Sequence, residues 1–475
     1  MNQPHRWYDY ITINSYWFAL TTRAQVLTPL VIPLLVQHFV GETAKGARVG
    51  NIRLWALMVA VLVQALMGML SDRSTLRWGR RRPFIFVGTL GELVVFVLIG
   101  FTTALTGMSG YWVLFLLYIF SMIFSNTAHA ATQGLIPDLV PAAKRGFFSG
   151  VKALLELPLP LIYISFIVGR LISTGNLWGA LLALMAVMVI CMAVTMVVPE
   201  QPLLRAPSAP EWRSFLRLLL MTVVFTLIIL SMGTVVRVFM QRSADLPAPL
   251  VPIVWGLAGL VGMGVAIALG VRLSIRIGIG PEIHQNRSFT WWVVNRLAFL
   301  AAAINLSGFM LFFLQERFVD LAGEKAAEPA ARIIMLVGIS ILLVVLPGGW
   351  LADRVGKRPL VAASGLLAMI GTLIFVVVPT LAAIYVGGCL VGAAIGLFYT
   401  TNWALGTDIV PEAQAGRYLG LSNLAGAGAG AIGAYIGGPI ADSVGYVLLF
   451  MIYGLLFFLS VVALLGVQEK PDPVG

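Results

Sequence analysis

The chain has 475 residues, of which 59% are hydrophobic and only 11% are charged, with a formal net charge of +11. A nucleic-acid-binding protein is excluded, because the basic residues lie in short segments between apolar runs and not on one polar face. The two cysteines, Cys191 and Cys389, both lie inside apolar runs. Neither a disulfide framework nor a cysteine metal site is therefore expected.

Apolar runs follow one another along the whole chain, and each is long enough to cross the roughly 30 Å hydrocarbon core of a bilayer. The runs are continuous and do not alternate, which favours helices over barrel strands. The predicted fold is therefore an all-α polytopic membrane protein. Fourteen spans are predicted, near residues 14–40, 52–71, 84–105, 111–136, 147–171, 177–198, 214–236, 251–275, 289–314, 333–352, 360–379, 382–406, 417–440 and 444–466.

Two sequence echoes relate the two ends of the chain. Ser15 and Arg23 in the first span recur, with the same spacing, as Ser288 just before the ninth span and Arg296 within it. The stretch IPDLVPAAKRGFFSG also resembles GTDIVPEAQAGRYLG. This second alignment places Asp138 on Asp408, Pro141 on Pro411, Gly146 on Gly416 and Gly150 on Gly420.

The echoes predict two homologous six-helix halves with extra helices between them, an architecture found in many secondary transporters. The predicted parts are an N-terminal six-helix bundle over 1–199, a cytoplasmic linker over 200–213, an inserted transmembrane helix pair with its connection over 214–287, and a C-terminal six-helix bundle over 288–475. With both termini in the cytoplasm, most lysines and arginines lie on cytoplasmic segments, as the positive-inside rule requires. The predicted location is a bacterial cytoplasmic (inner) membrane.

Arginine-rich loops follow the second span of each half. LSDRSTLRWGRRRP occupies 70–83 and LADRVGKRP occupies 351–359. Each loop places a carboxylate at one helix end and cationic side chains at the start of the next helix, which suits charge-assisted bonds to neighbouring helix ends. The alternative, topological anchoring alone, would not need the aspartate, glycine and proline. The predicted conformational latch comprises Asp72, Arg73, Gly79, Arg80, Arg82, Asp353, Arg354, Gly356, Lys357 and Arg358.

The same loops carry a family resemblance. DRSTLRWGRRRPFI (72–85) is similar to the glycoside-pentoside-hexuronide symporters and the sucrose-transporter group. GGWLADRVGKRP (348–359) resembles the general major facilitator superfamily motif between the second and third helices of a half. The resemblance covers nearly the whole chain apart from the inserted pair. It implies alternating access by rocking of two six-helix bundles around a central site.

Enzyme chemistry has no positive signal. The chain contains no Walker loop, H-E-x-x-H or nucleophile elbow. The G-x-G-x-x-G match within GAGAGAIGAYIGG (426–438) lies inside a span and follows no strand, so close helix packing by small residues explains it better than a dinucleotide site. We therefore predict a protein that is not an enzyme and has no catalytic residue, cofactor or metal site.

Ionisable residues at membrane depth are candidate functional residues, because they are costly unless paired or hydrated. Arg23 and Arg296 occupy matching positions, and each is either a substrate or counter-ion contact or part of an internal salt bridge. Glu92 either neutralises Arg23 or carries a proton. Lys152 and Glu156 lie one helical turn apart, as a structural pair or a pair broken during proton coupling.

A polar stripe in the fourth span contains Asn126, His129 and Gln133 at helical spacing. His129 is either a hydrogen-bonded packing residue or a proton relay. A similar stripe in the second half contains Tyr399, Asn402 and Trp403, and Asn295 adjoins Arg296. Amides bind hydroxyl groups and aromatic rings cover the apolar face of a sugar, whereas interhelical hydrogen bonding is the structural alternative. The predicted substrate-binding residues are Arg23, Asn126, His129, Gln133, Asn295, Arg296, Tyr399, Asn402 and Trp403.

Together these features predict a secondary active transporter for a sugar, glycoside or similar small polar solute. Proton coupling is predicted through Glu92, His129, Lys152 or Glu156, and sodium coupling is not favoured, because the second span offers only Gln64 and the fourth has no carboxylate. One alternative is an organic-anion, hexuronide-like transporter. Another is a non-transporting membrane assembly factor. The expected partners are the solute and the lipid bilayer, with a membrane protein docking on the inserted helix pair in the last alternative.

Overall fold

The computed structural model describes residues 6–141, 144–200, 202–203, 212–278, 287–410 and 415–468, with no description of side chains over 415–425. Within these ranges the chain is helical and contains no strand. Most of the predicted linker 200–213 lies outside the described residues, as does Pro411 of the second echo.

Helices over the first 200 residues follow the predicted runs, because lipid requires each segment to satisfy its own backbone hydrogen bonds. Two segments, η1 and η4, are π-helical, and proline residues lie within or just before them. The elements are α1 (Asp9–Thr12), α2 (Ser15–Val26), η1 (Leu27–Val31), α3 (Ile32–Val40), α4 (Lys45–Ser71), α5 (Arg82–Phe101), η2 (Thr102–Ala104), α6 (Gly107–Leu139), α7 (Arg145–Glu156), α8 (Pro158–Tyr163), η4 (Ile164–Val168), α9 (Gly169–Ser173) and α10 (Leu177–Met196).

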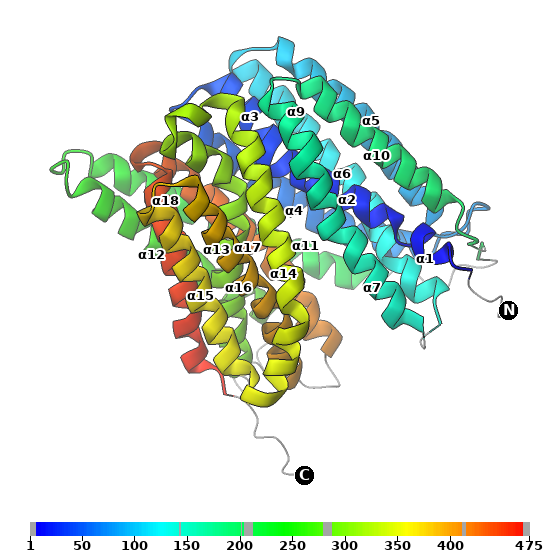
Figure 1. Cartoon of the computed structure of the whole chain (residues 1–475). Coiled ribbons are helices and arrows are strands. Elements are labelled where there is room, and N and C mark those ends of the chain that lie inside the picture. Colours follow the sequence, from blue (N-terminus) through cyan, green and yellow to red (C-terminus); the bar gives the residue numbers. More distant parts are fainter. Residues whose placement is uncertain are drawn as a thin grey trace. The chain divides into compact units, whose positions relative to one another are not determined.

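The remaining elements are long helices joined by short connections (Figure 1). They are α11 (Trp212–Arg242), α12 (Val251–Gly278), α13 (Arg287–Arg317), η6 (Val319–Leu321), η7 (Gly323–Ala326), α14 (Ala327–Val355), α15 (Lys357–Val377), α16 (Leu381–Ile409), α17 (Ala415–Val444), α18 (Tyr446–Ala463) and η9 (Leu464–Gly466).

Among the described residues, 13 helical stretches are long and apolar enough to cross a membrane. The α17 helix adds a further element of 30 residues, although the side chains of its first turns are not described. The all-α polytopic fold with about fourteen spans is therefore confirmed. The prediction starts the second span too late, because residues 45–51 are already helical.

The chain packs as two compact units. Unit 1 comprises Met1–Phe39, Val59–Leu216 and Gly323–Met335, and unit 2 comprises Val40–Met58, Arg217–Ala322 and Leu336–Gly475. Helices α4 and α14 thus each contribute residues to both units. The predicted domain limits given above stay a prediction.

In unit 1, α2 packs on α10, and α5 packs on both α6 and α10, which run alongside it in Figure 1. The Ser15 and Thr195 hydroxyls hydrogen-bond at 2.9 Å and join the first helix to the sixth of this half. In unit 2, α13 packs on α17 and α18, and α15 packs on α16. Ser288 there accepts a bond from the Gln468 amide at 3.1 Å, just beyond α18. The two echoed serines thus tie the first helix of each half to its last.

The start of α4 packs against α17 within unit 2. The Asp442 carboxylate accepts hydrogen bonds from the backbone N–H groups of Gly46 and Ala47, each at 2.7 Å. A Cβ at Gly46 or at Gly438 would overlap the other helix, so glycine permits the close approach. The carboxylate satisfies two N–H groups that have no partner within their own helix, which explains why α4 begins at Lys45.

Asp442 is expected to make stability pH-dependent. It lies beyond the apolar run 417–440, and burial raises its pKa to about 6, although the two N–H donors, the Tyr446 hydroxyl and the Lys45 ammonium pull the pKa down. Glu42 pairs with Lys45, and Glu316 accepts bonds from the start of α18. A raised carboxyl pKa stabilises the folded chain below pH 4, and this contribution is lost as the pH rises through 6.

The unfolding free energy of the wild type is therefore expected to fall by about 1 kcal/mol between pH 5 and pH 7 relative to Asp442→Asn. Thermal unfolding of the two detergent-solubilised proteins across this range measures the difference. A difference that does not change with pH would contradict the assignment to Asp442.

Candidate functional site

A buried ion pair joins α2 to α5 in unit 1. The Arg23 Nε lies 2.7 Å from the Glu92 Oε1, and the two side chains are 4% and 0% exposed. The Ser121 hydroxyl of α6 donates to the same carboxylate oxygen at 2.6 Å and accepts from the Arg23 guanidinium. The second oxygen, Glu92 Oε2, is buried and has no hydrogen-bond partner among the residues that the structure describes. Of the two sequence interpretations of Arg23, the structure thus contains the internal salt bridge.

A second polar group in unit 1 surrounds Trp17 of α2. The Lys152 ammonium of α7 lies 3.7 Å from the centroid of this indole and 3.3 Å from the Glu156 Oε2. The His129 ring of α6 packs edge-on against Trp17 at 5.4 Å. The Gln133 amide lies 3.2 Å from the His129 Nε2. Four of the predicted residues therefore gather around an aromatic side chain that was not predicted.

Asn126 does not join this group by hydrogen bonding in the described structure. Its amide donates to the Met122 carbonyl of its own helix at 2.8 Å and lies 3.9 Å from the Met122 sulfur. The residue is nearly buried. Its predicted contact with substrate stays a prediction.

In unit 2 three of the predicted residues, Asn295 and Arg296 of α13 and Asn402 of α16, form one hydrogen-bonded chain. The Arg296 Nη1 donates to the Asn402 Oδ1 at 3.0 Å, and the Asn402 amide donates to the Asn295 Oδ1 at 2.8 Å. The Asn295 amide in turn donates to the Ser460 carbonyl of α18 at 2.8 Å. Both asparagines are fully buried, which favours the interhelical alternative for them. Tyr399 and Trp403, one helical turn apart, remain 44% and 40% exposed.

The first arginine-rich loop is organised by Arg81, which is 5% exposed. Its guanidinium pairs with Asp72, lies 2.8 Å from the Asp138 Oδ2 at the end of α6, and donates to the Ser71 hydroxyl at 2.8 Å. Arg80 pairs with the same Asp138. The predicted latch contained Asp72 and Arg80 but omitted Arg81.

Glu200, which follows α10, completes this loop. Its carboxylate accepts from the backbone N–H groups of Arg81 at 2.7 Å and Arg82 at 3.1 Å and so caps the start of α5. Gly79 has φ +109°, and a Cβ there would overlap Glu200. Glycine is required here for both its conformation and its size. Arg73 donates to the Met69 carbonyl at 3.1 Å.

The second loop repeats part of this arrangement. Lys357 pairs with Asp408, the residue that the sequence echo aligns with Asp138. Gly356, like Gly79, has a positive φ, of +95°. The Arg354 guanidinium stacks on Trp350, 4.0 Å from the ring centroid. Whether the ten predicted residues act as a latch stays a prediction.

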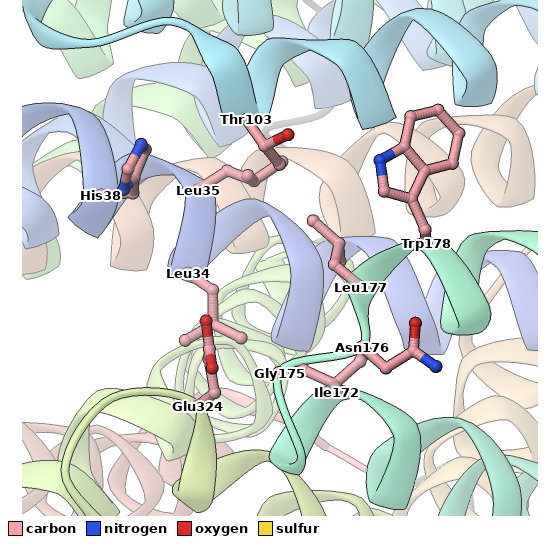
Figure 2. A pocket seen from close by; sticks show the side chains of 10 residues that line it. All are labelled: Leu34, Leu35, His38, Thr103, Ile172, Gly175, Asn176, Leu177, Trp178 and Glu324. Carbon is pink, nitrogen blue, oxygen red and sulfur yellow. The ribbon is translucent and has the colours of Figure 1, made fainter.

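Unit 1 also contains a pocket of about 340 Å³ that no sequence feature indicated (Figure 2). Its polar groups, His38, Thr103, Asn176 and Glu324, surround apolar residues of α3 and α10. None of its ten lining residues is a predicted site residue. In the described ranges, His, Cys, Asp and Glu side chains form no group of three or more able to hold a metal ion.

Comparison with known proteins identifies the family. The Major Facilitator Superfamily model matches residues 18–318 and 297–475, nearly the whole chain. The chain belongs to the major facilitator superfamily. With its membrane-length helices, it is an integral multi-pass membrane protein. No curated protein matches it in sequence.

Solved structures share this facilitator fold at low sequence identity. A variant of the nucleoside transporter NupG matches with TM-score 0.66 and 11% identity, covering 96% of this chain and 99% of that one. A D-xylose-proton symporter matches with TM-score 0.61 and 17% identity, covering 97% and 98%. The human organic anion transporter MFSD10 matches with TM-score 0.54 and 16% identity, covering 97% and 100%. These likenesses establish the fold alone.

Proposed function

We propose that this facilitator-superfamily chain is a secondary transporter that moves a small polar solute across a membrane by alternating access and couples the movement to protons. Its family and fold support transport in general terms. The observation that carries the coupling proposal is the Arg23–Glu92 pair, which is buried within two predicted spans. It leaves one carboxylate oxygen without a partner in the described part of the chain.

The chemistry of this pair suits a reversible proton site. Glu92 Oε1 receives both neighbouring donors, whereas Oε2 is free to hold a proton. A buried carboxylate keeps its charge only while a cation stays close, because burial alone disfavours the ionised form. Any movement of α2 that draws Arg23 away therefore favours proton uptake by Glu92, and its return favours release.

A sugar or glycoside is the proposed solute class. The similarity of 72–85 to the glycoside-pentoside-hexuronide and sucrose-transporter groups supports it. So does the group around Trp17, where an amide, an imidazole and a charged pair adjoin an aromatic face. Such a surface combines hydrogen-bonding groups for hydroxyls with a ring for the apolar side of a sugar.

Flux in sealed proteoliposomes tests the proposal. Wild-type protein is expected to accumulate a sugar or glycoside when a pH gradient is imposed. Glu92→Gln is expected to lose this accumulation and to retain exchange between labelled and unlabelled solute, because exchange needs no net proton movement. Glu156→Gln tests the second coupling candidate. Glu328→Gln is the matched control, since Glu328 forms a partly exposed ion pair with Arg332.

Undiminished accumulation by Glu92→Gln would assign the proton elsewhere. Absence of both accumulation and exchange in folded wild-type protein would refute transport of this solute class and favour the assembly-factor alternative. For that alternative the described residues offer no specific support, because four glycines of α12 pack against α11, α17 and α18 and the exposed side chains over 253–269 are apolar, as lipid contact requires.

A further inference from the structure

Arg296 is a buried cation without a carboxylate partner in the part of the chain that the structure describes. The residue is 7% exposed. Its one hydrogen bond goes to the neutral amide oxygen of Asn402, and its Nε has no acceptor. Arg23, at the matching position of the other half, is neutralised by Glu92. The two echoed arginines therefore differ in charge balance, which the sequence alone did not distinguish.

The neighbours of Arg296 fix its position without cancelling its charge. The Asn402 amide nitrogen donates to the Asn295 Oδ1, so the Asn402 oxygen is directed to the guanidinium. The buried Trp292 indole donates to the Asn402 carbonyl at 2.9 Å and holds this turn of α16. A guanidinium cannot lose its proton under ordinary conditions. Arg296 therefore remains charged, ordered and incompletely bonded.

Two aromatic rings lie near this cation. The Arg296 guanidinium carbon lies 5.9 Å from the Trp292 centroid and 5.4 Å from the Trp403 centroid. Trp403 is 40% exposed, so a ligand that lies on its ring has the guanidinium close by. Burying an unpaired charge is unfavourable, and an incoming anion would recover part of that cost through charge-assisted hydrogen bonds.

We infer that Arg296 is the receptor for a carboxylate on the transported solute, and that the solute is a monoanionic sugar acid or similar hydroxylated organic acid. One uncompensated charge in this cluster matches one negative charge on the ligand. The partly exposed Trp403 ring, beside the guanidinium, offers a face for the apolar side of such a molecule. That this acid is transported rests on the proposed function, but binding of an anion at Arg296 is testable without transport.

The experiment uses two probes that differ only at one carbon, phenyl β-D-glucuronide and phenyl β-D-glucoside, together with glucuronate and glucose. Binding to full-length protein in detergent is measured by tryptophan fluorescence and by the shift in unfolding temperature. We expect the two acids to bind more tightly than their neutral partners. Arg296→Gln is expected to weaken acid binding by about tenfold to a hundredfold, as for the loss of a charged hydrogen-bond partner.

Asn402→Asp is the decisive second variant. It keeps the size of the side chain and places a carboxylate against Arg296, so the cation becomes internally neutralised without being removed. We expect this protein to fold and to lose acid binding to a similar extent. Arg332→Gln, which removes a surface ion pair, is expected to bind as the wild type does.

The outcomes separate the two proposals. If the wild type binds the acids and Asn402→Asp does not, the anion site is supported. If the same wild-type protein shows no flux in proteoliposomes, transport is refuted. If flux or binding of the neutral probes is the same in both variants as in the wild type, the result supports transport and overturns the anion site. Failure of either acid to bind folded wild-type protein also overturns it.

Discussion

Replacing Arg23 with glutamine is expected to lower the free energy of unfolding by about 3–5 kcal/mol, because removing one partner of a buried ion pair leaves the other charge uncompensated. Glu92 is fully buried, and among the described residues its only other donor is the Ser121 hydroxyl. Unfolding of the detergent-solubilised variant at pH 7, monitored by tryptophan fluorescence, measures the loss.

The double variant Arg23→Gln/Glu92→Gln is the matched control, because it removes both charges and keeps the side-chain volumes similar. It is expected to recover most of the stability that Arg23→Gln loses. A double variant as unstable as the single one would show that packing of the arginine, not its charge, holds α2 to α5. Arg332→Gln removes a partly exposed ion pair, so it is expected to change the free energy of unfolding only slightly.

The membrane spans were predictable because the bilayer imposes a simple rule on composition. A run of apolar residues of sufficient length is enough to define a helix there. Helix starts were less predictable. The beginning of α4 at Lys45 depends on the Asp442 carboxylate, which is distant in sequence, and no local feature of residues 45–51 indicates this partner. The π-helical segments are likewise not encoded by hydropathy.

The candidate site was predictable where residues on one helix decide it. The Lys152–Glu156 pair and the adjacency of His129 and Gln133 follow from helical spacing. Trp17, Ser121 and Glu200 were missed because their roles depend on helices packing side by side. The sequence did contain a signal for Arg81. The echo aligned Asp138 with Asp408, which marks both aspartates as repeated features, and in the structure each pairs with a cation of the preceding loop. Charge balance at Arg23 and Arg296 required the structure, because the sequence places an arginine at both.

Arg81→Ala is expected to cost about 2–4 kcal/mol of stability, because it removes the side chain that joins Asp72, Ser71 and Asp138 and leaves the buried Ser71 and the mostly buried side chain of Asp138 without this donor. The Glu200 cap uses the Arg81 backbone N–H, which the alanine variant retains, so the loss reports the guanidinium alone. Arg81→Lys is expected to recover only part of it, since an ammonium lacks the fork of donors that binds several acceptors at once.

Arg77 provides the control within the same loop. Its side chain is exposed, so Arg77→Ala is expected to change stability by no more than about 0.5 kcal/mol. If positive charge in this loop served only to orient the chain in the membrane, the two alanine variants would behave alike, because orientation depends on the number of positive charges and not on their contacts. Equal unfolding temperatures for Arg77→Ala and Arg81→Ala would therefore favour topological anchoring, and a large gap between them would favour the latch.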